Sequence, residues 1–163
     1  MKKGLVVMGS DSDLKVMEKC VDRLKSFDIP TEVRICSAHR TPAVAEQLAK
    51  NAAAEGFGVI IAAAGKAAHL GGVLAAYTTL PVIGVPMATS VMGGMDSLLS
   101  IVQMPKGIPV ATVAIDGADN AAILAAQMIA LSDDALAQKL AQFKADMAAE
   151  VTAKDEKVRA QFA

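Results

Sequence analysis

Both histidines of the sequence lie in short segments of polar and small residues. His39 belongs to S-A-H-R-T-P at 37–42, and His69 belongs to G-K-A-A-H-L-G-G at 65–72. Histidine can take up and release a proton near neutral pH, and the planar guanidinium of Arg40 suits a phosphate group. The two segments therefore favour acid–base chemistry on an anionic small molecule. A helix-capping surface loop around His39 and a hydrogen-bonded core histidine at position 69 are the plainer alternatives.

A third polar segment, G-S-D-S-D at 9–13, comes directly before a helical pattern. Its backbone N–H groups and hydroxyls, together with the positive end of the helix dipole, can bind a phosphate. Carboxylates repel phosphate, so we expect Asp11 or Asp13 to accept hydrogen bonds from sugar hydroxyls or to cap the helix. Ordinary capping by Ser12 or Asp13 would also explain this segment. The glycine spacings of Walker and dinucleotide-binding loops are absent.

Short apolar runs alternate with helical patterns along the chain. We expect strands at 5–8, 31–36, 58–64, 82–86 and 109–115, and helices at 14–24, 43–55, 72–78, 96–104 and 118–131. This alternation predicts the α/β class, with a parallel five-stranded sheet between helices in a three-layer α/β/α sandwich. The segment 31–36 is the least apolar strand and belongs at an edge. The strand order 2-1-3-4-5 would bring the three polar segments to one rim, where such sheets bind ligands.

Length and charge limit the possibilities further. With 163 residues the chain suits a single domain, 1–163, with a core at about 3–131 and an extra C-terminal helix at about 133–159 that extends beyond the body. A net charge of −1 gives no reason to expect a nucleic-acid partner. The apolar run at 5–8 is too short for a signal peptide or a membrane span.

Cysteines and aromatic residues argue against several kinds of site. Cys20 and Cys36 have no paired spacing, which fits a reducing, cytoplasmic location without disulfides. The two histidines and two cysteines show no metal-binding spacing, so no metal is expected. A flavin-binding module would need aromatic rings for stacking, but Tyr77 is the single tyrosine and the chain has no tryptophan.

Four motifs, in this order and spacing, closely resemble the bacterial PurE family: G-S-D-S-D at 9–13, S-A-H-R-T-P at 37–42, A-G-K-A-A-H-L at 64–70 and D-S-L-L-S-I-V-Q-M-P-K-G-I-P-V at 96–110. The resemblance runs from residue 5 to about 131. It implies a flavodoxin-like fold, a homo-octamer, and a place in de novo purine biosynthesis beside an ATP-dependent synthase. The implied reaction is a mutase reaction without metal or organic cofactor. It moves the carboxylate of N5-carboxyaminoimidazole ribonucleotide from the exocyclic nitrogen to carbon 4, giving 4-carboxy-5-aminoimidazole ribonucleotide. A less common form of the family carboxylates aminoimidazole ribonucleotide directly with carbon dioxide.

The resemblance also implies roles for individual residues. The substrate-binding positions are Ser10, Ser12, Asp13, Ser37, Ala38, Arg40, Gly65 and Leu70, and the catalytic positions are His39 and His69. Ser10 and Arg40 would hold the 5′-phosphate, and Asp13 the ribose hydroxyls. Ser37 and Ala38 would line the ring and carboxylate pocket, His39 would be the general acid and base, and the loop of Gly65, His69 and Leu70 would close over the carboxylate. Ala67, Ala68 and Leu70 are expected to form apolar walls that retain carbon dioxide.

This sequence departs from the family pattern at two positions. Lys66 stands where the mutase form usually has glycine, and Gly71 stands where it usually has proline. The lysine would change the charge near the carboxylate, and losing the proline should loosen the loop. Arg40 favours the mutase over the direct carboxylase, which more often has lysine there. A nucleotide- or flavin-binding module and a pure assembly protein with structural histidines remain alternatives of other classes.

Overall fold

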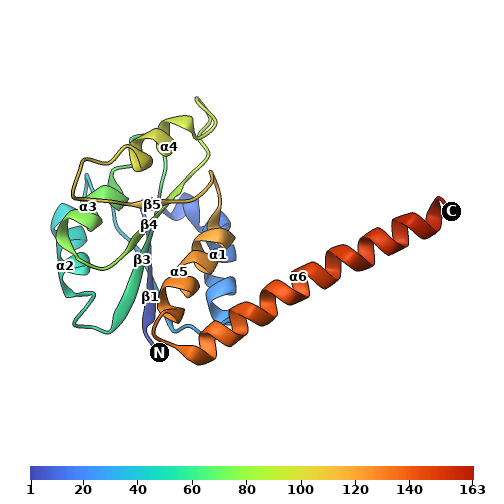
Figure 1. The fold of residues 1–163 in the computed structure, drawn as a ribbon. Helices are drawn as coiled ribbons and strands as arrows, with labels where there is room; N and C mark the ends of the chain where they lie inside the picture. The colour runs from blue at the N-terminus through green and yellow to red at the C-terminus, as the bar shows by residue number, and fades with distance from the viewer.

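The computed structural model describes residues 1–163 and places five parallel strands in one sheet (Figure 1). The strands are β1 (Lys3–Met8), β2 (Thr31–Ile35), β3 (Phe57–Ala64), β4 (Val82–Pro86) and β5 (Ala111–Thr112). Their order is β2-β1-β3-β4-β5 with every pairing parallel, so the predicted strand order and the edge position of β2 are confirmed.

The fifth strand is much shorter than predicted. A strand was expected at 109–115, but only Ala111–Thr112 pair with β4. Beyond this pair, the N–H groups of Val113 and Asp116 donate to carbonyls that lie two residues apart along β4, at 3.1 and 2.8 Å. The segment from Val113 to Asp116 therefore advances three residues while β4 advances only two, from Gly84 to Pro86. The extra residue breaks the regular ladder, as in a bulge.

Helices follow each strand. They are α1 (Leu14–Ser26), α2 (Pro42–Asn51), α3 (Leu70–Tyr77), α4 (Met95–Val102), α5 (Ala118–Ala130) and α6 (Asp134–Gln161), and a short 3-10 helix, η1 (Asp11–Asp13), precedes α1. Pro42 is the first residue of α2, where its missing N–H costs nothing. Helix α2 ends four residues earlier than predicted and α3 begins two residues earlier.

The capping prediction for the first helix is wrong. Asp13 precedes α1 but its side chain makes no capping hydrogen bond. Instead the hydroxyl of Ser10 accepts a hydrogen bond from the N–H of Ser12 at 3.3 Å, at the start of η1. The 3-10 turn moves the cap toward the N-terminus, from the predicted Ser12 or Asp13 to Ser10.

Two hydrophobic clusters cover the two faces of the sheet, because side chains alternate along each strand. On β1, Val6 and Met8 pack with α1 and α5, whereas Leu5 and Val7 pack with α2, α3 and α4. Five alanines of α5 are fully buried, at positions 118, 121, 122, 125 and 126. Small side chains let this helix approach the sheet closely, which explains how a core with few aromatic residues is filled. These packed faces confirm the predicted three layers (Figure 1).

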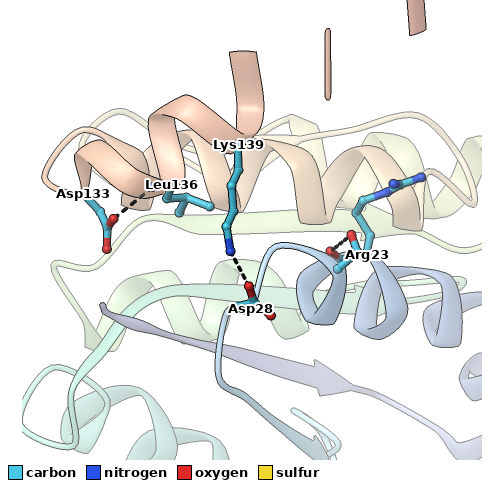
Figure 2. A network of polar contacts seen from close by, with 6 residues as sticks. Arg23, Asp28, Asp133, Leu136 and Lys139 are labelled. Atoms are coloured by element: carbon cyan, nitrogen blue, oxygen red, sulfur yellow. Dashed lines mark hydrogen bonds and ion pairs between the residues drawn. The ribbon is translucent and has the colours of Figure 1, made fainter. Parts of the chain in front are cut away.

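The first turns of α6 are anchored on the body (Figure 2). The Asp133 carboxylate accepts a hydrogen bond from the N–H of Leu136 at 3.0 Å, which caps the helix. The Leu136 side chain is fully buried in the cluster of α1 and α5. One turn later, Lys139 forms an ion pair with Asp28, which follows α1.

The rest of α6 projects from the body (Figure 1). The last packed ring is Phe143, whose edge meets Phe27 with 5.5 Å between ring centroids and whose face receives the Arg23 guanidinium at 4.7 Å. All residues beyond it are exposed. At 1.5 Å per residue the helix is about 42 Å long. The predicted extension of the C-terminal helix beyond the body is confirmed. None of the helices is both long and apolar enough to cross a membrane.

Candidate active site

A cavity of about 720 Å³ opens at the carboxyl ends of β1, β2 and β3. This volume suits a small-molecule ligand. The residues predicted from sequence that line it are Ser10, Ser12, Asp13, Ser37, Ala38, His39, Arg40, Gly65, His69 and Leu70. The structure therefore brings together the three polar segments that were expected to share one rim.

The Ser10 hydroxyl organises the segment after β1. It lies 3.0 Å from the Ser12 hydroxyl and donates to the Asp11 carboxylate at 3.2 Å. The half-buried Asp13 carboxyl has a raised pKa, first because burial disfavours its charged form and then because the carboxylates of Asp116 and Asp11 are near. A carboxylate in this state is stabilised by hydroxyl donors, which a sugar would supply.

The segment after β2 is held by its own hydrogen bonds. The Thr41 hydroxyl donates to the Ser37 carbonyl at 3.0 Å and accepts from the Ser37 N–H at 3.0 Å. The Ser37 hydroxyl accepts from the backbone N–H of Arg40 at 3.1 Å and lies 3.4 Å from its Nε. Arg40 takes part in none of the ion pairs of the chain. Its guanidinium is thus positioned in the cavity with free donors for an anion.

His39 and His69, which both line the cavity, are in direct contact with each other. Nε2 of His39 and Nδ1 of His69 are 2.7 Å apart, and the rings meet edge to face with 4.9 Å between centroids. A hydrogen bond of this kind needs one protonated and one unprotonated nitrogen, so the pair can hold and pass a single proton between two loops. Sequence reasoning placed both residues on one rim. It did not predict their contact, which depends on side-chain orientation.

The segment after β3 makes two consecutive tight turns. The carbonyl of Lys66 accepts from the N–H of Ala68, and that of Ala67 accepts from the N–H of His69, both at 2.8 Å. Ala67 and Leu70 line the cavity as predicted. Ala68 does not: the turn directs it into the core between the sheet and α2, where it is only 1% exposed. The prediction of Ala68 as a wall of the cavity is therefore wrong.

A fourth wall of the cavity comes from Met87, Ala88, Thr89 and Ser90, which follow β4. The sequence analysis did not single out these lining positions. The polar pair Thr89-Ser90, shortly after the buried strand β4 ends at Pro86, was the signal that could have found them. The segment is held in place by α4 and by the end of the β5 segment. The Thr89 hydroxyl donates to Asp96 at 2.8 Å, and the N–H of Ala88 donates to the Asp116 carboxylate at 2.9 Å.

The cavity offers proton transfer and anion binding. No group of three His, Cys, Asp or Glu side chains is placed to hold a metal ion. The polar lining consists of the histidine pair, the cations Arg40 and Lys66, the Asp13 carboxyl, and the hydroxyls of four serines and Thr89. This set suits an anionic small molecule that carries hydroxyl groups and that gains or loses protons.

Comparison with known proteins identifies the family. The sequence model of a family described as AIR carboxylase matches residues 4–150. The chain belongs to the AIR carboxylase family. The resemblance to PurE proteins inferred from four motifs is thereby confirmed.

Several known proteins are similar to this chain in sequence or structure. The N5-carboxyaminoimidazole ribonucleotide mutase of Methanocaldococcus jannaschii is 53% identical over 96% of this chain and 98% of its own. The mutase of the same name from Thermotoga maritima is 52% identical, covering 94% and 90%. A chloroplastic phosphoribosylaminoimidazole carboxylase of Vigna aconitifolia is 51% identical over 86% of this chain but only 25% of its own length. The crystal structure of Treponema denticola PurE superposes with a TM-score of 0.86 at 30% identity, over 94% of this chain and 96% of that one.

Proposed function

We propose that this protein converts N5-carboxyaminoimidazole ribonucleotide to 4-carboxy-5-aminoimidazole ribonucleotide in de novo purine biosynthesis. The observation that carries the proposal is the histidine pair, 2.7 Å between ring nitrogens, in a cavity that also holds the free guanidinium of Arg40. Relatives that carry the mutase name at 52–54% identity over 90% or more of this chain support it.

The substrate's phosphoribosyl group has matching partners on two loops. We assign the 5′-phosphate to Arg40 and to the hydroxyls of Ser10 and Ser12, which supply a fixed positive charge and hydrogen-bond donors. We assign the ribose hydroxyls to Asp13. The raised pKa of this carboxyl marks a group that lost solvent on folding, and sugar hydroxyls would restore hydrogen bonds to it.

The imidazole ring and its carboxylate occupy the other half of the cavity. Ser37 and Ala38 line the ring side, and the loop of Gly65, His69 and Leu70 closes over the carboxylate. The apolar side chains of Ala67 and Leu70 limit water at this end. That matters because free carbon dioxide must stay beside the ring between the two half-reactions.

The proton balance of the reaction needs one group that works in both directions. Breaking the N–C bond releases carbon dioxide while the exocyclic nitrogen keeps its electron pair and takes a proton. Carbon 4 then attacks the carbon dioxide and afterwards loses its own proton, which restores the aromatic ring. His39 donates the first proton and accepts the second, so it ends as it began. His69, hydrogen-bonded to it, holds the imidazole orientation and exchanges the proton with it.

Direct carboxylation of aminoimidazole ribonucleotide is the second candidate. The plant relative carries a carboxylase name, and the carbon–carbon bond formed would be the same. The experiment compares two substrates. N5-carboxyaminoimidazole ribonucleotide is generated in situ and the 4-carboxy product is followed by ultraviolet absorbance. A parallel reaction contains aminoimidazole ribonucleotide and bicarbonate without ATP. The mutase predicts fast conversion only in the first reaction. Conversion only in the second would replace the mutase by the carboxylase.

We also propose that the chain acts as a homo-octamer in the cytoplasm, together with the ATP-dependent synthase that makes its substrate. One face of α4 exposes Met95, Leu99 and Val102, and the projecting part of α6 exposes Met147 and Val151. Exposed apolar side chains on two helices favour burial against other copies of this chain. Light scattering should give a mass about eight times the 16.8 kDa of one chain. A mass of one chain would refute the octamer.

A further inference from the structure

Lys66 is the charged residue of the cavity to which no role has been given above. It follows Gly65 at the end of β3 and lines the cavity. Its backbone has φ of 56°, in the left-handed region that non-glycine residues avoid. A side chain retained in such a conformation at a binding site is a reason to look for a functional role.

The side chains of the other two non-glycine residues with positive φ both have partners within the chain. Asp28 forms an ion pair with Lys139, and the Asp116 carboxylate accepts from the N–H of Ala88. Aspartate also tolerates this conformation better than lysine. The Lys66 side chain has no hydrogen bond or ion pair within the chain. Its ammonium therefore has no partner that the chain itself supplies.

The charges of the cavity and of the proposed substrate can be matched. The charged lining residues are Asp13, Arg40 and Lys66, which give two cations and one anion. The substrate and the product each carry two anionic groups, the 5′-phosphate and a carboxylate. Arg40, on the loop after β2, is assigned to the phosphate. Lys66 lies on the loop after β3, which holds the carboxylate end of the cavity.

We propose that Lys66 determines specificity: its ammonium binds the carboxylate that is transferred, so that the site prefers carboxylated ribonucleotides over aminoimidazole ribonucleotide. This inference rests on the proposed function. The contact would persist while the carboxylate is on nitrogen and after it reaches carbon 4. It would be absent for the uncarboxylated ring, which has only the phosphate to offer to a cation.

The expected loss of affinity follows from the solvent exposure of Lys66. Lys66 is solvent-exposed, so its attraction for a carboxylate is partly screened by water and salt. We expect its loss to weaken binding of the 4-carboxy ribonucleotide roughly 5-fold, between the values typical of exposed ion pairs and of hydrogen bonds to charged groups. Binding of aminoimidazole ribonucleotide should not change.

The test measures dissociation constants of both ribonucleotides by calorimetry for the wild type, Lys66→Gln and Lys66→Gly. Glutamine removes the charge and keeps the strained backbone, whereas glycine removes both. Lys25→Gln, in the last turn of α1 and away from the cavity, is the matched control. We expect both Lys66 variants to lose affinity for the 4-carboxy ribonucleotide alone, and the control to lose none.

Three results would overturn the inference. Equal weakening for both ribonucleotides would make Lys66 a phosphate contact. Weakening in Lys66→Gly but not in Lys66→Gln would make the effect one of backbone freedom. Unchanged constants in both variants would leave no role for the charge. In all three cases a wild type that binds both ribonucleotides keeps the proposed function intact. A wild type that binds neither would overturn that function and this inference with it.

Discussion

Removing the Ser97 hydroxyl should loosen the fourth wall of the active site. Ser97 is completely buried on α4, and its hydroxyl donates to the Met87 carbonyl at 2.5 Å and lies 3.0 Å from the Gly94 carbonyl. The Gly94 carbonyl also accepts from the N–H of Leu98, but no backbone N–H donates to the Met87 carbonyl. Ser97→Ala would therefore leave a buried acceptor without a partner.

A buried polar group without a partner costs about 1–3 kcal/mol. For a chain of this size, a loss of about 2 kcal/mol lowers Tm by roughly 4–8 °C. Met87 begins the segment that lines the cavity through Thr89 and Ser90, so substrate KM should also rise. Calorimetric melting and steady-state kinetics on purified Ser97→Ala measure both effects.

Ser100→Ala is a matched control for this prediction. Its hydroxyl lies on the same helix and donates mainly to the Asp96 carbonyl, at 2.6 Å, within the preceding turn. The Asp96 carbonyl also belongs to the backbone hydrogen bonding of α4. Losing the additional donor should therefore lower the free energy of unfolding by only about 0.5 kcal/mol or less. Equal Tm values for the two variants would refute the reasoning from the unpaired Met87 carbonyl.

Two further predictions concern the site and the projecting helix. Because burial raises the pKa of Asp13 above its ordinary 3.8, the folded protein binds this proton more tightly than the unfolded chain, and the ionised form costs stability at neutral pH. Asp13→Asn should therefore raise Tm at pH 7 while abolishing ribose recognition. The Tm gain should shrink as pH falls through the raised pKa of the folded protein toward 3.8, and it should be absent at lower pH; a gain that grows with acid would contradict the sign. Phe143→Ala removes the last packed ring of α6 and should lower the free energy of unfolding by about 2 kcal/mol, less than for a fully buried phenylalanine. Chemical denaturation measures that loss, and an unchanged midpoint would mean that this part of α6 does not anchor on the body.

The clustering of the site could be predicted from sequence because it depends on topology. Parallel strands bring their carboxyl ends to one edge, so three polar segments after neighbouring strands had to meet. The short β5 was missed because a bulge depends on the partner strand. The cap at Ser10 was missed because a 3-10 turn and the first turn of an α-helix have similar residue preferences.

Details below the level of topology were beyond sequence reasoning. Whether His39 and His69 merely share a rim or bond directly depends on rotamers and on the two tight turns after Gly65. The burial of Ala68 follows from the same turns. The positive φ of Lys66 is a property of the folded loop, and a lysine in the sequence gives no indication of it.

The most direct test of the account is the turnover of N5-carboxyaminoimidazole ribonucleotide by His39→Asn. Asparagine keeps a similar size and a hydrogen-bond donor toward His69 but cannot carry the proton. Positioned acid–base groups contribute about 10²–10⁴ to a rate, so we predict that kcat falls by about 100-fold or more while the dissociation constant of the product stays within about threefold. A kcat within tenfold of the wild type would contradict the central role of His39 in the reaction.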